Sequence, residues 1–152
     1  MMAVEMLRRT AEYDYWANKT CFDAITAAGK QPKAEELFGH ILNAQRIWHA
    51  RIAGLDSTGI EVFPAADMTA FGARIGEVRA LWEVFLAGLN DGTLTRFAPY
   101  RTTTGAEYST AVGDVVNHVF LHSAYHRGQI ALVLRSSGAV PPATDFIAFA
   151  RL

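Results

Sequence analysis

The segment Asn117–Ile130 reads NHVFLHSAYHRGQI and carries three histidines, each four residues after the last. Side chains four residues apart lie on the same face of an α-helix, one turn above the other. We therefore expect a long helix, from about Ala111 to Ser137, with imidazoles along one side. Either these histidines are core residues satisfied by hydrogen bonds, or some of them bind a metal ion.

Three earlier stretches show helical periodicity, at about Val4 to Ala28, Lys33 to Ala53 and Thr69 to Leu89. In each of them apolar residues recur at spacings of three and four, which indicates a helix with one buried face. The first stretch ends at Gly29 and the second at Gly54, and a glycine just past the last periodic residue is a common helix stop. The chain is therefore predicted to contain four amphipathic helices.

Two irregular segments separate these helices. The segment from Asp56 to Met68 contains glycine and proline and is too long for a tight helical hairpin, so it indicates a long crossover between helices two and three. The segment Thr93–Thr110, TLTRFAPYRTTTGAEYST, predicts a short β-hairpin before helix four, with Pro99 confining its first half to an edge or broken strand. We expect an all-α four-helix bundle that forms a single domain over residues 1–152.

The composition suits a compact soluble protein rather than a disordered one. Hydrophobic residues make up 51% of the chain, charged residues make up 19%, and the net charge is -1. This balance predicts no nucleic-acid partner and no membrane surface, and no apolar run is long enough for a membrane span. Cys21 is the only cysteine, which excludes an intrachain disulfide and a cysteine-rich zinc site. With no secretory signal in the first residues, the expected location is the cytoplasm.

The row of histidines is too long to bind one ion along its whole length. A step of four residues climbs about 6 Å, so His118 and His126 lie about 12 Å apart along the helix axis. Zinc–nitrogen bonds are only about 2.0–2.1 Å long, whereas two histidines at i and i+4 can share an ion. On a helical wheel, His122 and His126 lie in the middle of the apolar stripe, and His118 lies towards its edge. His122 and His126 are therefore the candidate ligand pair.

A stable site needs a third ligand from another helix, and His40 and His49 are the remaining histidines. His40 lies about 60–80° from the centre of the apolar stripe of helix two, whereas His49 lies beyond about 100° and is expected to face solvent. His40 is the better candidate. Three imidazoles would leave coordination positions open, as catalytic zinc sites do. Packed, hydrogen-bonded histidines are the alternative interpretation of the same spacing.

Other polar residues lie near the predicted site. Asp14 and Asn18 are expected on the inner face of helix one, either as partners of the metal ligands or in a hydrogen bond at the end of the bundle. Arg127 is predicted to point off the buried face, whereas Gln129 is the expected neighbour of the metal ligands. Cys21 is interpreted as a small buried residue rather than a nucleophile. His118 and His49 are interpreted as structural or surface residues.

The sequence as a whole resembles the DinB/YfiT-like family of metal-dependent enzymes with a four-helix-bundle fold. Four segments carry the resemblance, in the family's order: EYDYWANK (Glu12–Lys19), LFGHILNAQRIWHARI (Leu37–Ile52), HSAYHRGQI (His122–Ile130) and PPATDFIAF (Pro141–Phe149). The third segment is the most specific. The resemblance implies a metal triad of one histidine from helix two and both histidines of the HxxxHRGQ motif, which here are His40, His122 and His126.

The resemblance also implies a function. Members of the family include metal-dependent hydrolases and transferases that join low-molecular-weight thiols to electrophiles, and many are homodimers. The expected cofactor is a divalent metal ion, with zinc, nickel, copper and iron all compatible with imidazole ligands, and the second cofactor is a low-molecular-weight thiol. A bound ion could lower the pKa of water or hold a thiol as thiolate, so either reaction on a small-molecule substrate fits.

Two other functions stay open on the sequence. The chain could be a non-catalytic protein that binds a metal or ligand in a stress response, or a structural bundle whose histidines are core residues. Metal content separates the structural bundle from the other two functions. Catalytic turnover that is lost when His40 is substituted separates the enzyme from the binding protein.

Overall fold

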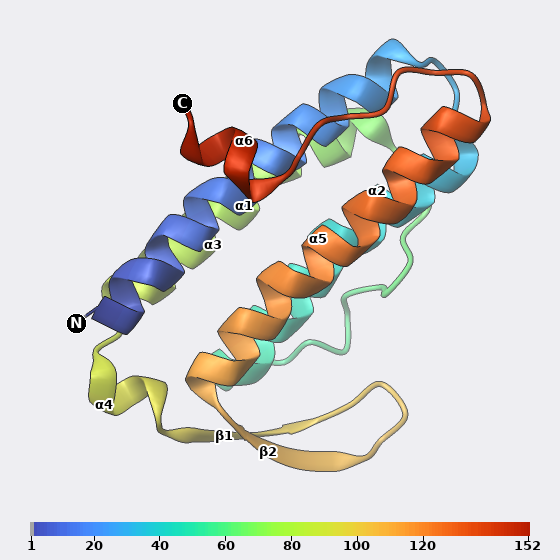
Figure 1. The fold of residues 1–152 in the computed structure, drawn as a ribbon. Coiled ribbons are helices and arrows are strands. Elements are labelled where there is room, and N and C mark those ends of the chain that lie inside the picture. The colour runs from blue at the N-terminus through green and yellow to red at the C-terminus, as the bar shows by residue number, and fades with distance from the viewer. Residues whose placement is uncertain (1) are drawn as a thin grey trace.

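The computed structural model describes residues 2–152, and most of them are helical. The four long helices are α1 (Met2–Ala27), α2 (Pro32–Ala53), α3 (Met68–Ala87) and α5 (Val112–Ser136). Two short helices, α4 (Asp91–Leu94) and α6 (Phe146–Ala150), and two strands, β1 (Phe97–Arg101) and β2 (Glu107–Ala111), complete the described chain (Figure 1). Each long helix begins and ends within two residues of its predicted limits. The sequence did not predict α4 and α6, because helices of four and five residues are too short to show a period.

The helices begin and end at residues that commonly start and stop helices. Pro32 occupies the first turn of α2, where its missing N–H costs no hydrogen bond, and Gly54 ends the helix with a left-handed φ of 72°. The Asp67 side chain accepts a hydrogen bond from the backbone N–H of Ala70 at 3.0 Å and so caps the start of α3. Residues 54–67 therefore form the irregular crossover that the sequence predicted between α2 and α3.

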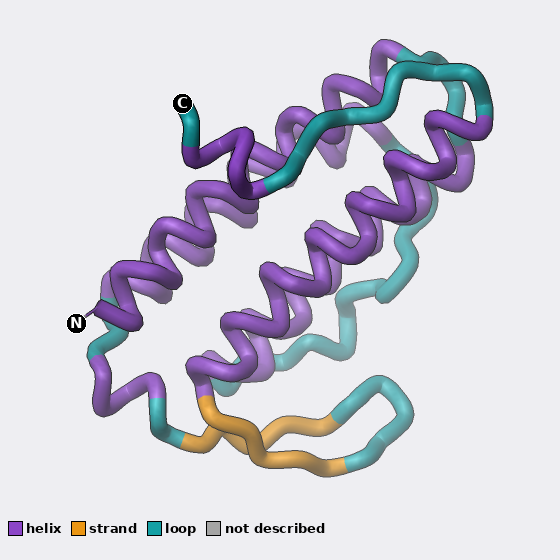
Figure 2. Tube along the Cα trace, in the orientation of Figure 1, coloured by secondary structure: helices purple, strands orange, loops and turns teal. Residues whose placement is uncertain are grey.

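The predicted hairpin is confirmed as a two-stranded antiparallel sheet. Phe97 pairs with Ala111 at one end and Arg101 pairs with Glu107 at the other, and Gly105 lies in the turn with a φ of 88°. Pro99 lies within β1, which is an edge strand because the sheet has only two strands. The hairpin lies below the first turn of α5, at the same end of the molecule as α4 (Figure 2).

Each long helix packs mainly against two of the others, with a smaller contact between α1 and α2. The main pairs are α2 with α5, α1 with α3, α1 with α5, and α2 with α3. In Figure 1, α2 and α3 run in one direction while α1 and α5 run in the other. Two consecutive helices can run in the same direction only if the chain between them returns along their full length, and residues 54–67 do this.

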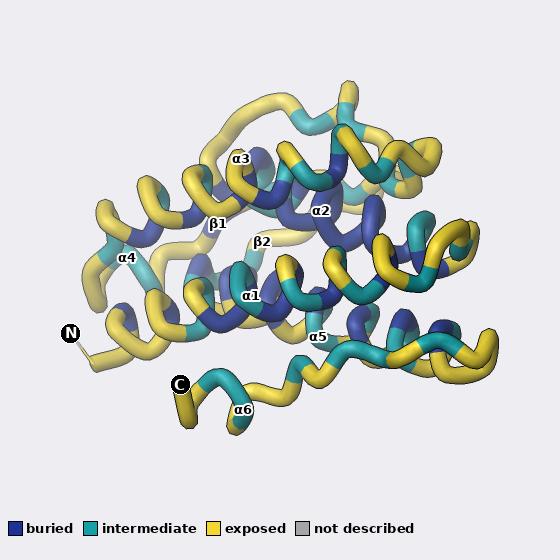
Figure 3. The backbone as a smooth tube through the Cα atoms, turned by 90° about the horizontal axis from the view of Figure 1, so that it is seen from above, coloured by how far each residue is buried: buried dark blue, intermediate teal, exposed yellow. Residues whose placement is uncertain are grey.

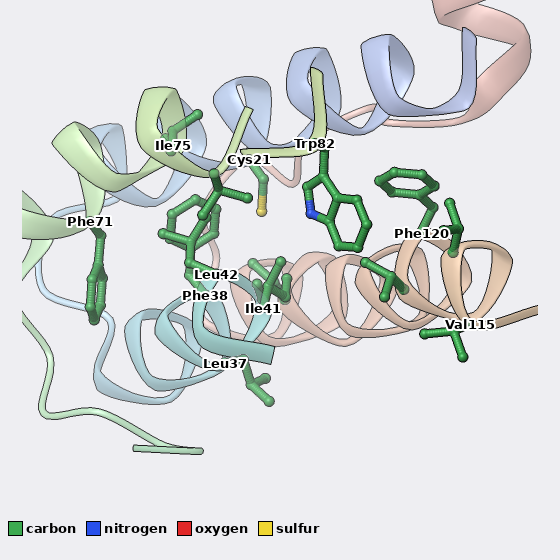
Figure 4. Packing of buried hydrophobic residues seen from close by; sticks show 14 of the residues in the cluster. Cys21, Leu37, Phe38, Ile41, Leu42, Phe71, Ile75, Trp82, Val115 and Phe120 are labelled. Atoms are coloured by element: carbon green, nitrogen blue, oxygen red, sulfur yellow. The ribbon is translucent and has the colours of Figure 1, made fainter. Parts of the chain in front are cut away.

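The facing sides of the four long helices are buried (Figure 3), and most of the buried residues are hydrophobic. Phe38, Ile41 and Leu42 of α2 are fully buried and share one hydrophobic cluster with Ile75 and Trp82 of α3 (Figure 4). Fully burying a side chain of this size contributes roughly 1.5–3 kcal/mol, so this cluster contributes substantially to stability.

The C-terminal segment folds back over α1. The hydroxyl of Tyr13 donates a hydrogen bond to the carbonyl of Thr144 at 2.7 Å, and the Tyr13 ring packs edge-on against Phe146 at 5.2 Å. Phe149 also contacts Tyr13 and Trp16, which anchors α6 on the outside of α1. Among residues 2–152, no helix combines the length and the apolar character needed to cross a lipid bilayer.

Gly39 provides a test of how tightly α2, α3 and the crossover are packed. A Cβ atom at this position would lie 2.5 Å from the buried ring of Phe71 and 3.0 Å from Pro64. We expect Gly39→Ala to lower the free energy of unfolding by about 1–3 kcal/mol, as overpacked core substitutions do. Gly76 of α3 is the matched control, because its Cβ would meet nothing within 4 Å. Gly76→Ala should be neutral or stabilising by up to about 1 kcal/mol, and denaturant unfolding of both variants measures the difference.

Candidate metal centre

The structure brings together His40 of α2 with His122 and His126 of α5. One ring nitrogen from each residue lies within 4.8 Å of the other two. Nε2 of His122 lies 3.3 Å from Nε2 of His40 and 3.1 Å from Nε2 of His126. The i, i+4 spacing places the last two on one face of α5, and the packing of α5 against α2 brings His40 to them.

The outer nitrogens of two of these rings are held by hydrogen-bond acceptors. The Nδ1–H of His40 donates to the carbonyl of Val62 at 2.8 Å, and the Nδ1–H of His126 donates to Oε1 of Gln129 at 2.7 Å. Because each Nδ1 carries the proton of the neutral ring, the Nε2 lone pairs of His40 and His126 are free and face His122. This is the tautomer that metal-bound histidines adopt.

The cluster fits a metal ion better than it fits a network of hydrogen bonds. Nε2 of His122 can carry one hydrogen and donate it to only one of its two neighbours, so the Nε2 lone pair of the other ring would be left without a donor within the cluster. Two nitrogens that each lie about 2.05 Å from a tetrahedral zinc ion are about 3.3 Å apart. The distances of 3.3 and 3.1 Å match this separation.

Electrostatics also favour neutral rings in the cluster. Burial and then the neighbouring rings of His126 and His40 lower the pKa of His122 from its ordinary 6.5 to about 4. Burial likewise lowers the pKa of His40, although the hydrogen bond to Val62 acts in the opposite direction. A metal ion binds only the neutral ring, so these shifts keep His40 and His122 ready to act as ligands at neutral pH.

The crossover supplies a part of the site that the sequence did not reveal. The ring of Phe63 stacks on His40 with 4.2 Å between centroids, next to the Val62 carbonyl that orients the same imidazole. The side-chain amide of Asn43 donates to the carbonyl of Glu61 at 2.8 Å and holds this segment against α2. A backbone carbonyl leaves no signature in the residue types, whereas Gln129 was predicted from its position on the helix face.

The other two histidines lie outside the cluster. His118 is exposed and contacts Trp48 and His122 through its ring, which agrees with its interpretation as a structural or surface residue. The prediction that His49 faces solvent is wrong: its ring is half-buried against Trp82 and Phe85 of α3. The apolar stripe of α2 could not show this, because α3 covers a second face of that helix.

The prediction that Arg127 points away from the buried face is also wrong. Arg127 is 1% exposed, and its Nη1 donates to Oδ1 of Asp14 and to Oδ1 of Asn18, both at 2.7 Å. Asp14 and Asn18 therefore bind this guanidinium instead of a metal ligand or a group at the end of the helices. The error arose because α1 packs against a side of α5 that the stripe of apolar residues does not mark.

This ion pair belongs to a polar network that spans three helices. Oδ2 of Asp14 accepts hydrogen bonds from Nδ2 of Asn18 at 3.0 Å and from Nε2 of Gln45 at 2.6 Å. The same Nε2 donates to Oγ of Ser123 at 2.9 Å. Ser123 follows His122 on α5, and Gln45 lies on α2 with His40, so the network joins both ligand-bearing helices to α1.

Cys21 is fully buried, as the sequence predicted. Burial raises the pKa of its thiol to about 12, although the charge of Arg127 acts to lower it. At neutral pH the sulfur is therefore a protonated thiol, whereas nucleophilic attack requires the thiolate.

The fold and the three-histidine cluster define a helical protein with a cluster suited to metal binding. The model of the DinB family matches residues 7–152, and the chain belongs to this family. The fold is similar to the crystal structure of a DinB-like protein from Bacillus cereus, with a TM-score of 0.68, 14% sequence identity, and coverage of 91% of this chain and 95% of that one. No curated protein matches the sequence.

The Arg127–Asp14 pair should dominate the response of the core to mutation. Asp14→Ala leaves a buried guanidinium without its carboxylate and should lower the free energy of unfolding by about 3–5 kcal/mol. The double variant Asp14→Leu/Arg127→Met removes both charges and should be less destabilised than Asp14→Ala alone. Denaturant unfolding of both variants measures this, and a double variant at least as unstable as the single one would contradict the assignment.

Proposed function

We propose that the chain is a metal-dependent DinB-family enzyme of the cytoplasm that acts on a small molecule. In this proposal His40, His122 and His126 bind one divalent ion, and the reaction is hydrolysis or the transfer of a low-molecular-weight thiol to an electrophile. The convergence of the three Nε2 atoms carries the proposal, since no arrangement of hydrogen bonds among the three neutral rings satisfies all three. The proposal also includes a single domain over residues 1–152 and a four-helix-bundle arrangement, which the pairing of the long helices supports.

The residues around the cluster perform distinct tasks. Val62 and Gln129 fix the ring orientations of His40 and His126, so that the ligand nitrogens are organised before an ion arrives. Phe63 covers one face of His40 and limits access of water to that side. A bound divalent ion would supply Lewis acidity, which lowers the pKa of water or of a thiol. Three ligands from the chain leave positions for such a substrate.

A second function, a non-catalytic metal- or ligand-binding protein of a stress response, has one observation in its favour. The outer nitrogens of His40 and His126 contact a backbone carbonyl and a side-chain amide. These groups orient a ligand ring but do not exchange protons at neutral pH. General acid–base catalysis would then have to use a group of the substrate or the ion itself.

Metal binding tests the ligand set directly. We expect one divalent ion per chain in protein purified without a metal-affinity tag, measured by elemental analysis. His40→Ala, His122→Ala and His126→Ala should each weaken metal affinity by more than about 100-fold, and Gln129→Leu by about 10–100-fold, because outer partners of ligands typically contribute that much. His118→Ala and His49→Ala are the matched controls and should keep wild-type affinity. Full stoichiometry and affinity in all three ligand variants would exclude the triad.

Turnover tests the proposed reaction. Metal-loaded protein should convert electrophiles in the presence of common low-molecular-weight thiols, or hydrolyse ester or amide substrates, and the metal-free protein should be inactive. Cys21→Ser should retain activity, because a thiol with a pKa of about 12 is not a nucleophile at neutral pH. Equal rates with and without metal would refute the mechanism, and loss of activity in Cys21→Ser would replace it with a cysteine nucleophile. Metal binding without turnover would favour the binding protein.

A further inference from the structure

The solvent-facing side of α5 carries few charges for the outside of a helix in a bundle. Such faces normally bear charged residues, and both α1 and α3 have exposed acidic and basic side chains on theirs. Between Asp114 and Arg135, by contrast, the only aspartate, glutamate, lysine or arginine of α5 is Arg127, which is buried. Three large apolar side chains are exposed in this interval instead: Leu121 at 69%, Tyr125 at 66% and Leu132 at 61%. This face therefore has the composition of a contact surface.

Most exposed residues of α5 follow a regular spacing. They form a stripe in which the steps alternate between four and three residues, which is the 3.5-residue period of helices that pack lengthwise against a partner. The members of this outer stripe are Asp114, His118, Leu121, Tyr125, Gly128, Leu132 and Arg135. Every member is exposed, so the outer stripe lies on the side of α5 opposite the core. A stripe with this period fits a second helix lying along α5.

The two ends of the outer stripe carry opposite charges. Asp114 lies in the first turn of α5 and Arg135 lies in the last, about 32 Å away along the helix axis. Neither side chain belongs to any of the ion pairs that the structure shows within residues 2–152. A second α5 running antiparallel would bring Asp114 of each copy to Arg135 of the other, whereas a parallel copy would bring like charges together. The charges of the outer stripe are therefore complementary to those of its own antiparallel copy.

The middle of the outer stripe is complementary to itself in side-chain size. In an antiparallel pair centred beside Tyr125, positions equally far from the centre face each other, so Leu121 of one copy faces Gly128 of the other. Gly128 has no side chain, and the space that its Cβ would occupy is open, so Leu121 of the second copy can approach α5 closely. Tyr125 lies near the centre, and its ring packs edge-on against His126 with 5.2 Å between centroids, which favours one ring orientation. Aromatic side chains at such a position are typical of the centre of an interface.

We propose that the outer stripe is the contact surface of a homodimer in which two α5 helices pack antiparallel across a two-fold axis beside Tyr125. Leu121, Tyr125 and Leu132 form its apolar centre, and an ion pair between Asp114 and Arg135 closes each end. A second copy of this chain is favoured over an unrelated partner because the outer stripe matches its own antiparallel copy in both charge and side-chain size. The contact does not depend on the proposed function, although it lies beside the histidine cluster because Tyr125 touches His126.

Sedimentation velocity of the full chain over a series of concentrations tests the surface. We expect a monomer–dimer equilibrium with a Kd of about 1–100 μM in metal-free and metal-loaded protein, because one helix pair is a small interface. Leu121→Glu and Leu132→Glu each place a charge in the apolar centre and should raise the Kd at least about tenfold. All of these sites are exposed, so the variants should fold, which circular dichroism checks.

Val84→Glu is the matched control. Val84 is an apolar residue of α3 that is 76% exposed and lies outside the outer stripe, so its substitution should leave the Kd unchanged. A wild-type chain that stays monomeric at about 500 μM would overturn the proposal. A dimer that Leu121→Glu and Leu132→Glu do not weaken, or that Val84→Glu weakens equally, would also overturn it.

Charge reversal at low ionic strength tests the direction of the two helices. Asp114→Arg and Arg135→Asp should each raise the Kd at least about threefold, because each leaves like charges facing at both ends of an antiparallel pair. The double variant Asp114→Arg/Arg135→Asp restores opposite charges at both ends and should return the Kd to within about twofold of the wild-type value. In a parallel pair like charges would face each other in all four proteins, so the single variants would not weaken the dimer. Single variants equal to the wild type, or a double variant that does not recover, would refute the antiparallel pairing.

Discussion

The buried ion pair between Arg127 and Asp14 joins two helices whose residues are 113 positions apart in the sequence. Both side chains are almost completely removed from water, so each charge is tolerable only while the other stays in place. The pair therefore favours one placement of α5 against α1. Gln45 and Ser123 extend the network to α2, the helix that carries His40. The network around this pair thus also connects the helix of His40 to the helix of the histidine pair.

The network connects two regions of different chemistry. On α5 it reaches Ser123, the neighbour of His122, in a region where imidazole nitrogens converge with free lone pairs. Towards α3, Asp14 and Gln45 line a cavity whose walls also include the rings of Trp82 and Phe120. A change in either region that moved Gln45 would also displace α2, the helix that bears His40. Close-packed interiors transmit such displacements instead of absorbing them.

The parallel direction of α2 and α3 explains why the crossover contributes groups to the histidine cluster. Since α2 and α3 run in the same direction, residues 54–67 must return along the outside of α2 (Figure 1). That path brings the Val62 carbonyl to Nδ1 of His40 and the Phe63 ring to its face. A short turn between α2 and α3 would reverse the direction of α3 and leave the His40 imidazole without its acceptor.

The sequence by itself determined the four long helices, the hairpin and the pairing of His122 with His126, because each is encoded in local spacing. Periods of 3.6 residues mark buried faces, and the i, i+4 rule puts His122 and His126 together whatever surrounds them. Only the tertiary structure decided the environment of Arg127 and His49, since a helix with two packed neighbours is buried on faces that its apolar stripe does not mark. It also decided the part played by Val62, because a backbone carbonyl is present at every residue and becomes specific only where the fold places a donor against it.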